Sequence, residues 1–318
     1  MKKKNILLLA IIFILFSISA ESAFSQTGLK AVKSSLKQEE VQTAEVNLKA
    51  STIETASKAS IKTGAITGQN VKLRQGPSTS DKVIFDVLYG TKCEVLEEKN
   101  GFARVKFDNG VTGWMSKTFI TYTDKNLLEG PKYTPEALEK AASEFQKKYA
   151  AYTANRNKAN YDAFKKSYYT YRELVKNSDD YKAIQKNPAA GKIVVDKKTY
   201  TLTLYLNDKP VRVFPIAYGQ NPDGRDKQKV GDCRTPDGSF KIINKEKRPY
   251  EGVATRWMQL STKWGDIGIH GTPMPDSIGS KASHGCVRMY SQDSIELFQL
   301  VKVGTPVTIK GYSSEKIN

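Results

Sequence analysis

The 318-residue chain has only two histidines, His270 and His284, and three cysteines. Two histidines without an ordered set of acidic or cysteine partners make a poor zinc site, so we expect no metal and no cofactor. An odd number of cysteines leaves at least one thiol free or bonded between chains. If Cys286 is the free thiol, Cys93 and Cys233 could form a bridge. Those two fall in different predicted domains, however, and we expect both to be free.

A long hydrophobic run is also missing. The apolar stretch 6–16 is short for a membrane-spanning helix. It follows three lysines at 2–4 and precedes small residues around 19–23, which is the pattern of a secretory signal over 1–23. We expect cleavage rather than anchoring, and the absence of cysteine near the cleavage region argues against a lipid anchor. The chain is therefore expected to be exported to the periplasm or cell envelope.

Aromatic residues are absent from 25–62, which is rich in Ser, Thr, Ala, Lys, Gln and Glu. Such a segment cannot bury much apolar surface, so 24–62 is predicted to be a flexible linker. The formal net charge of +17 suits the anionic polymers of a cell envelope. Nucleic acid would also attract a basic protein, but no nucleic-acid reading motif is present and export argues against that partner.

Residues 63–123 contain short stretches in which apolar and polar residues alternate. Turn pairs such as Gly76-Pro77 and Asn109-Gly110 separate these stretches. Alternation with such turns predicts a small β-barrel.

Residues 133–188 show helical periodicity instead. Thr134-Pro135-Glu136 supplies an N-cap, a proline at the first helical position and an acid near the positive end of the helix dipole. Aromatic residues then recur at spacings of three and four on both sides of the segment 155–160, which predicts a hairpin with facing aromatic stripes. The many lysines of this segment could contact an anionic polymer, although we favour an aromatic core with solvated lysines.

The last region, 191–310, is a series of strand patterns with hairpin turns and one helix over 291–301. The whole chain is therefore predicted to be mainly β and multidomain. It would consist of a small β-barrel over 63–123, an α-helical hairpin spacer over 133–188, and a β-rich C-terminal domain over 191–310 with a minor helix.

Both histidines and Cys286 lie within the segment 269–289. A thiol is a nucleophile as its thiolate, and an imidazole is the usual group that removes its proton. Gly285 permits a tight turn that presents the sulfur, and the N–H groups of Gly285 and Cys286 could face a developing oxyanion. Arg288 would lie on the same strand face as Cys286 and could hold a substrate carboxylate; the alternative is a solvated surface arginine.

This segment closely resembles the signature of the L,D-transpeptidases, the YkuD-like catalytic domain of bacterial cell walls. The matching residues are His270-Gly271-Thr272 and Ser283-His284-Gly285-Cys286-Val287-Arg288, with further likeness at 214–219, 235–240 and 303–307. The resemblance implies that Cys286 is the nucleophile and that His270 is the acid/base, while the role of His284 is less certain. Ser283, Gly285 and Gly271 would support the site, and Thr272 and Arg288 would bind substrate. The residue after the first histidine is Gly271, so only its carbonyl could orient His270.

The motif at 70–78 and the Gly113-Trp114 pair resemble bacterial SH3-like domains of wall enzymes. The resemblance implies binding of wall peptides, and the alternative is a spacer that binds nothing.

Together these resemblances imply a cysteine-dependent L,D-transpeptidase of peptidoglycan synthesis, with roles in cell wall biogenesis and cell shape. Its partners would be peptidoglycan stem peptides, as donor and acceptor, and it would form 3-3 cross-links or attach another amine acceptor. Hydrolysis at the same site would instead make an L,D-carboxypeptidase, and a non-catalytic peptidoglycan-binding protein is a further alternative. A Cys-His endopeptidase is disfavoured, because its cysteine precedes its histidine and no histidine follows Cys286.

Overall fold

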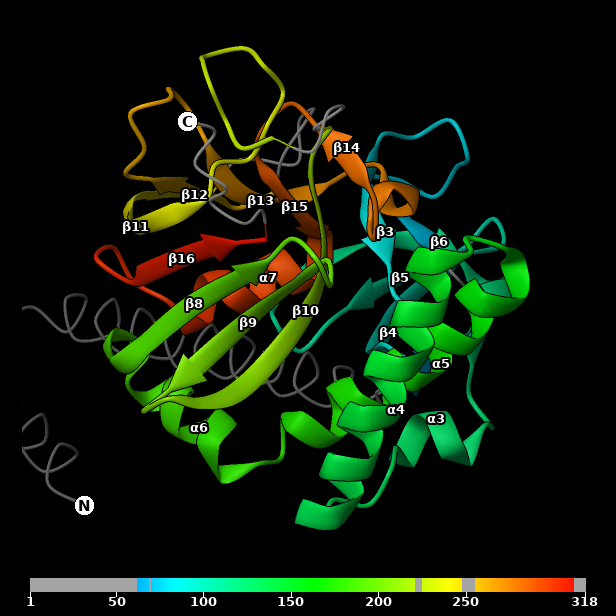
Figure 1. Ribbon diagram of the computed structural model, residues 1–318. Helices are drawn as coiled ribbons and strands as arrows, with labels where there is room; N and C mark the ends of the chain where they lie inside the picture. The colour runs from blue at the N-terminus through cyan, green and yellow to red at the C-terminus, as the bar shows by residue number, and fades with distance from the viewer. Residues whose placement is uncertain (1–61, 69, 221–224, 248–254, 312–318) are drawn as a thin grey trace, which may run out of the picture. The chain divides into compact units, whose positions relative to one another are not determined.

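The computed structural model describes residues 62–68, 70–220, 225–247 and 255–311 (Figure 1). The predicted signal segment lies outside these residues, as does the predicted linker apart from Lys62. The described residues all belong to one compact unit. Within the described ranges, no helix is both long enough and apolar enough to cross a membrane.

The N-terminal part of this unit is a seven-stranded antiparallel sheet. Its strands are β1 (Lys62–Ile66), β2 (Val71–Arg74), β3 (Val83–Val87), β4 (Lys92–Lys99), β5 (Phe102–Lys106), β6 (Thr112–Ser116) and β7 (Ile120–Thr121), in the order β3-β2-β6-β5-β4-β1-β7. Alternate residues of these short strands, among them Leu73, Phe85 and Met115, fill a common core. Gly110, at a φ of +79°, closes the β5–β6 turn, as the Asn-Gly pair predicts.

Four helices follow: α3 (Lys125–Glu129), α4 (Pro135–Ala154), α5 (Lys158–Val175) and α6 (Asp179–Lys186). The predicted cap is confirmed, because the Thr134 hydroxyl accepts a hydrogen bond from the Ala137 N–H at 3.0 Å. The chain leaves the helical path at Asn155, and Asn157 caps the start of α5 through the Asn160 N–H. The break predicted over 155–160 therefore separates two antiparallel helices.

Aromatic rings fill the interface between α4 and α5. The Phe145 and Tyr171 rings stack with centroids 5.1 Å apart, and the Tyr149 and Phe164 centroids are 4.9 Å apart. The predicted facing stripes are thus confirmed as core. The hairpin also contacts the C-terminal sheet, since the Tyr149 hydroxyl donates to the Tyr200 carbonyl at 2.9 Å.

The C-terminal part is built of nine strands and one helix. They are β8 (Gly191–Asp196), β9 (Thr201–Leu206), β10 (Lys209–Gly219), β11 (Gly238–Glu246), β12 (Trp257–Leu260), β13 (Gly268–Thr272), β14 (Lys281–Ser283), β15 (Val287–Tyr290), α7 (Ser291–Leu300) and β16 (Pro306–Lys310). Their order is β14-β10-β15-β13-β12-β11-β16-β8-β9. Because β9 also pairs with β10, the sheet closes on itself.

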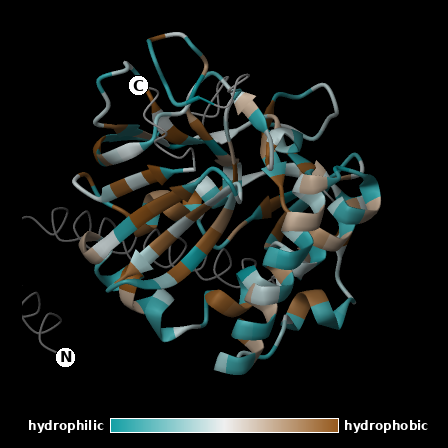
Figure 2. Cartoon of the chain, in the orientation of Figure 1, coloured by the Kyte–Doolittle hydropathy of each residue, from teal (hydrophilic) through white to brown (hydrophobic). Residues whose placement is uncertain are grey.

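The long strand β10 makes this closure possible. Its first part pairs with β9, and its last residues pair with β15 and β14. Buried residues alternate with more exposed ones along β8 and most of β9, and both strands are rich in apolar residues (Figure 2). One face of these strands therefore packs into the core, as a period of two requires. The chain is mainly β with few helices, as the sequence predicts.

Candidate active site

Two neighbouring parallel strands carry the candidate catalytic residues. β13 contains His270, and β15 begins directly after Cys286. The register pairs His270 with Arg288, which lies two residues after Cys286. Successive side chains alternate across a sheet, so the pleat favours one face for His270, Arg288 and Cys286. The two predicted catalytic residues therefore come from adjacent chain segments rather than from opposite sides of the fold.

The His270 ring is held in one orientation by the backbone of the next residue. Its Nδ1 lies 2.8 Å from the Gly271 carbonyl oxygen. A carbonyl can only accept, so Nδ1 carries the proton and Nε2 carries the lone pair that can act as a base. The imidazole is only 5% exposed, and the Trp257 ring lies 5.7 Å away between centroids. The expected use of the Gly271 carbonyl is thus seen in the structure.

Gly271 also allows β13 to pack closely against α7. A Cβ at this position would lie 2.0 Å from Thr255 Oγ1 and 2.6 Å from Ser294 Oγ. The Gly271 N–H donates to the Thr255 carbonyl at 2.8 Å. Thr255 and Ser294, which the sequence did not single out, therefore fix the strand that carries His270.

Cys286 is partly exposed, and its Sγ lies 3.7 Å from the Asp266 carbonyl oxygen. Arg288 is only 7% exposed, which rules out the alternative of a solvated surface arginine. Burial lowers the pKa of Arg288, and the nearby Cys286 charge opposes that shift. A guanidinium beside a thiol favours the thiolate form of that thiol.

The turn that presents Cys286 is closed by Ser283. The Ser283 hydroxyl donates to the Cys286 carbonyl at 2.5 Å and accepts from the Gly285 N–H at 3.0 Å. Gly285 has a φ of +134°, where side chains other than hydrogen are strained. Ser283 and Gly285 therefore support the turn as expected. The Gly285 N–H, however, is already bonded within the turn, so this conformation does not offer it to an oxyanion.

Thr235 is a supporting residue to which the sequence gave no role. Its buried hydroxyl accepts from the Gly219 N–H at 2.8 Å and donates to the Gly285 carbonyl at 2.7 Å. It thus connects the end of β10 to the turn before Cys286. Thr235 lies fifty residues before Gly285 in the chain, so no local pattern could indicate this contact.

The two remaining predicted residues lie in different surroundings. Thr272 is 2% exposed, and its hydroxyl accepts from the Met274 N–H at 3.1 Å. That hydroxyl serves the local turn, and the substrate contact of Thr272 stays a prediction. His284 is exposed on the turn between Ser283 and Gly285.

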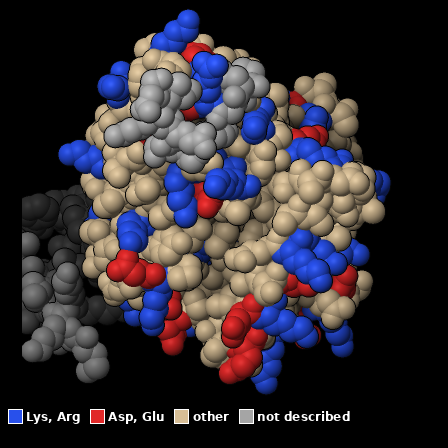
Figure 3. All heavy atoms as spheres, viewed as in Figure 1, with Lys and Arg blue, Asp and Glu red and all other residues tan. Residues whose placement is uncertain are grey.

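Several basic residues of the segment 225–247 already have partners in the structure. The buried Lys227 pairs with Asp232 at 2.6 Å, and Arg234 lies 3.5 Å from the same carboxylate. Lys245 donates to the Phe298 carbonyl at 2.7 Å. On the face drawn in Figure 3, basic side chains are scattered, and several lie beside acidic ones.

None of the three cysteines forms a disulfide in the structure, as expected for Cys93 and Cys233. Cys93 is buried in the SH3-like core, where burial raises the pKa of its thiol to about 11. Among the described residues, no group of three or more His, Cys, Asp and Glu side chains is placed to hold a metal ion.

Comparison with known proteins gives two domain matches. The profile of the L,D-transpeptidase catalytic domain (YkuD) matches residues 190–309, and that of the bacterial SH3 domain matches residues 69–121. The putative L,D-transpeptidase YkuD of Bacillus subtilis is 40% identical over 117 residues, which are 37% of this chain and 64% of the relative. The putative L,D-transpeptidase YqjB of the same organism is 33% identical over 140 residues, covering 39% of this chain and 74% of the relative.

A solved L,D-transpeptidase from Mycobacterium smegmatis superposes with a TM-score of 0.32 at 23% identity, covering 39% of this chain and 59% of that one. The match to YkuD spans 64% of that relative's length. The chain thus combines a domain matched by the L,D-transpeptidase catalytic profile with a bacterial SH3 domain. The chain belongs to the L,D-transpeptidase family.

Proposed function

We propose that this protein is an L,D-transpeptidase that acts on peptidoglycan stem peptides through a thioester on Cys286. The observation that carries the proposal is the parallel pairing of β13 with β15, which places His270 beside the strand that Cys286 precedes. The Nδ1 contact to Gly271 leaves Nε2 as the base. Membership of the family supports the same assignment.

In the first half-reaction, His270 Nε2 takes the thiol proton and Cys286 Sγ attacks the carbonyl carbon of the third residue of a tetrapeptide stem. The tetrahedral intermediate collapses by breaking the C–N bond to the terminal D-alanine. His270 returns its proton to the leaving amine, and a thioester remains on Cys286. Arg288, buried beside Cys286, stabilises the thiolate before attack and is positioned to attract a substrate carboxylate.

In the second half-reaction, a side-chain amine of another stem attacks the thioester carbonyl and loses a proton to His270. The C–S bond breaks, the thiol is restored and a 3-3 cross-link forms. Water in place of the amine would give the shortened stem and make the enzyme an L,D-carboxypeptidase. The accessible position of Cys286 on its turn admits either acceptor.

We also propose that the SH3-like domain holds wall peptide near this site. The protein would be exported to the periplasm or cell envelope, where this substrate occurs. The SH3 profile match supports a wall-binding module.

The test is incubation of the purified chain with disaccharide-tetrapeptide, followed by mass spectrometry of the products. We expect wild type to form the 3-3 dimer, whereas Cys286→Ala should form none. Cys233→Ser is the matched control, because Cys233 is a partly exposed free thiol with no part in the proposed reaction, so its loss should not change the rate. Tripeptide without dimer would assign hydrolysis instead, and a wild-type rate in Cys286→Ala would refute the thioester.

A further inference from the structure

Lys197 is a buried lysine in the turn between β8 and β9. Only 1% of its surface is exposed. Its backbone is fixed, because the Lys197 N–H donates to the Lys310 carbonyl at 2.8 Å and a Cβ on Gly311 would lie 2.6 Å from the Lys197 Cβ. Burial of an ammonium group is unfavourable unless acceptors surround it, so the partners of Lys197 indicate what this residue does.

The Lys197 ammonium group contacts one backbone carbonyl and two carboxylates. Its Nζ donates to the Thr235 carbonyl at 2.8 Å, and it lies 2.8 Å from Asp237 Oδ1 and 3.7 Å from Asp226 Oδ1. Asp226 Oδ1 also accepts from the Asp237 N–H at 2.8 Å. Burial lowers the pKa of Lys197, while Asp237 and Asp226 oppose that shift. Lys197 thus joins both ends of the segment 226–237 to the β8–β9 turn.

The middle of the same segment is fixed by one carboxylate. Asp232 Oδ2 accepts from the Gln228 N–H at 2.7 Å and from the Lys229 N–H at 3.1 Å. Asp232 Oδ1 accepts from the Arg234 N–H at 3.1 Å. The backbone of Thr235 is therefore held on one side by the Asp232 turn and on the other by Lys197.

Thr235 connects this segment to the turn that carries the nucleophile. Its hydroxyl donates to the Gly285 carbonyl at 2.7 Å and accepts from the Gly219 N–H at 2.8 Å. Gly285 comes directly before Cys286 in the chain. Two hydrogen bonds in series therefore connect Lys197 to the residue before the sulfur, and a shift of the Thr235 backbone would move the hydroxyl that holds this turn.

We propose that Lys197 is a positioning residue for Cys286 in the transpeptidase reaction. By holding the Thr235 carbonyl, Lys197 keeps the Thr235 hydroxyl on Gly285 and so fixes Sγ where attack on the substrate carbonyl requires it. A displacement of about 1 Å in a reacting group can lower a rate about 10²-fold, so a contact of this kind matters for catalysis. This role rests on the proposed function, since it assumes a thioester on Cys286.

The rate of acylation by imipenem measures how well the sulfur is placed. Intact-protein mass spectrometry at several imipenem concentrations separates the first-order acylation rate constant from the concentration that gives half the maximal rate. In Lys197→Met, we expect the rate constant to fall about 10–100-fold while the half-maximal concentration changes little, because the substrate contacts remain. Lys198→Met is the matched control, since it removes the same charge from the exposed neighbouring side chain and should react as wild type does.

A double-mutant cycle with Thr235→Val tests whether Lys197 acts through Thr235. Adding Lys197→Met to Thr235→Val should lower the acylation rate constant by less than about threefold further. The full effect of Lys197→Met in the Thr235→Val background would show that Lys197 does not act through Thr235, and it would overturn the proposal.

A second variant separates position from stability. Lys197→Met leaves Asp237 without its cation, which lowers the free energy of unfolding. Lys197→Met/Asp237→Ala removes both charges and supplies no new donor to the Thr235 carbonyl. With circular dichroism to show that the fold is kept, this variant should still be acylated about tenfold or more slowly.

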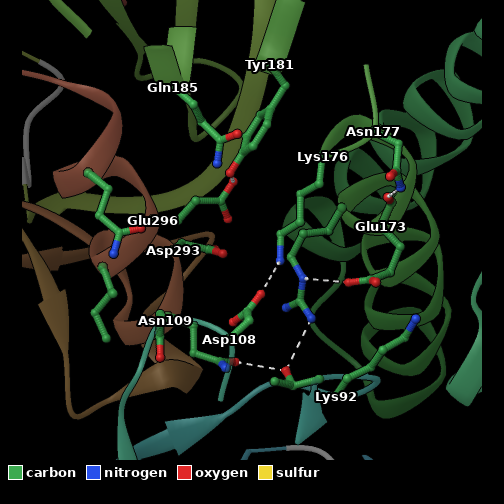
Figure 4. Close-up of a pocket in the computed structure, with 15 residues that line it drawn as sticks. Lys92, Asp108, Asn109, Glu173, Lys176, Asn177, Tyr181, Gln185, Asp293 and Glu296 are labelled. Carbon is green, nitrogen blue, oxygen red and sulfur yellow. Dashed lines mark hydrogen bonds and ion pairs between the residues drawn. The ribbon is translucent and has the colours of Figure 1, made fainter. Parts of the chain in front are cut away.

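Arg172 provides a control for stability alone. It is a buried cation in the wall of a cavity of about 490 Å³, part of which is labelled in Figure 4. The described residues that line this cavity include neither Lys197 nor Thr235. Arg172→Met should therefore lower the free energy of unfolding and leave the acylation rate constant of the folded protein unchanged.

The outcomes distinguish this role from the proposed function. A wild-type rate constant in Lys197→Met or in Lys197→Met/Asp237→Ala would overturn the positioning role and leave the thioester intact. Equal slowing in Arg172→Met would also overturn it, because loss of stability would then explain the effect. A wild-type protein that forms no imipenem adduct on Cys286 would instead refute the proposed function, and the role of Lys197 with it.

Discussion

At the scale of single residues, the candidate site depends on a few contacts that the sequence made visible and several that it did not. Cys286 and His270 could be recognised because nucleophile and base are chemically distinctive and occur within a short segment. Gly271 could be given a role because a glycine can orient its neighbour only through the backbone. The burial of Arg288 and Thr272 was not visible, because it depends on the pairing of β15 with β13.

Thr235 gives a prediction at this scale. Replacement by valine keeps the shape but removes the hydroxyl that bonds both Gly219 and Gly285. Two buried backbone groups then lose their partner, so we expect the free energy of unfolding to fall by about 2–4 kcal/mol. The rate of Cys286 acylation should also fall, because the turn before the sulfur is no longer fixed.

Urea denaturation and acylation kinetics check this prediction, with Thr235→Ser as the matched control that retains the hydroxyl. Thr235→Ser should stay close to wild type in both measurements. If valine and serine behave alike, the hydrogen bonds of Thr235 are not what holds the turn.

At the scale of elements, three segments meet around one buried arginine. Arg212 on β10 is fully buried. Its Nε donates to Glu296 Oε1 of α7 at 2.9 Å, and its Nη2 donates to the Tyr168 hydroxyl of α5 at 3.1 Å. The strand, the helical hairpin and α7 are thus joined by charge as well as by apolar packing. From the sequence, the helices could be predicted by their periodicity, but this junction could not, because its members lie 44 and 84 residues apart.

We predict that Arg212→Met lowers the free energy of unfolding by about 3–5 kcal/mol. The methionine fills similar space, but it leaves the carboxylates of Glu296 and Asp293 buried without their cation. Chemical denaturation measures the loss. The variant Arg212→Met/Glu296→Met/Asp293→Leu, which removes the whole charge cluster, should recover much of it. A triple variant as unstable as Arg212→Met would show that shape rather than charge explains the effect.

At the scale of the whole described unit, the SH3-like sheet, the hairpin and the catalytic sheet are docked on one another. The Leu88 N–H donates to Gln292 Oε1 of α7 at 2.8 Å, and Ile295 of α7 packs into the SH3-like core. The residue pattern of each of the three parts predicted the fold of that part, but no pattern indicated these contacts between the parts. A local pattern reports which face of an element is buried and not which partner covers it.

Lys165 makes this docking sensitive to pH. It is buried on α5, with Nζ 3.5 Å from Asn70 Oδ1 and 3.9 Å from the centre of the Tyr290 ring. Burial lowers the pKa of Lys165 to about 7; the carboxylates of Asp293, Asp276 and Asp86 oppose the shift, and Arg172 adds to it. The folded protein therefore holds fewer protons than the unfolded chain above about pH 7.

The free energy of unfolding should accordingly rise with pH from about pH 7 to about pH 8.5, and Lys165→Met should flatten that rise. Urea denaturation at several pH values measures both slopes. The window ends near pH ~8.5, where the Cys93 thiol of the unfolded chain begins to ionise. Burial raises the pKa of Cys93 to about 11 in the folded protein, so above this pH the Cys93 contribution lowers the free energy of unfolding as pH rises. Equal slopes in wild type and Lys165→Met would show that Lys165 does not titrate in this range.

The mechanism as a whole depends on a Cys286 sulfur that His270 makes reactive. The deciding measurement is the rate at which imipenem forms a covalent adduct, followed by intact-protein mass spectrometry and located by peptide mapping. We expect one adduct on Cys286 in wild type, none in Cys286→Ala, and a rate lowered about 10²–10⁴-fold in His270→Asn. An adduct on Cys93 or Cys233 in place of Cys286, or an unchanged rate in His270→Asn, would refute the Cys-His assignment.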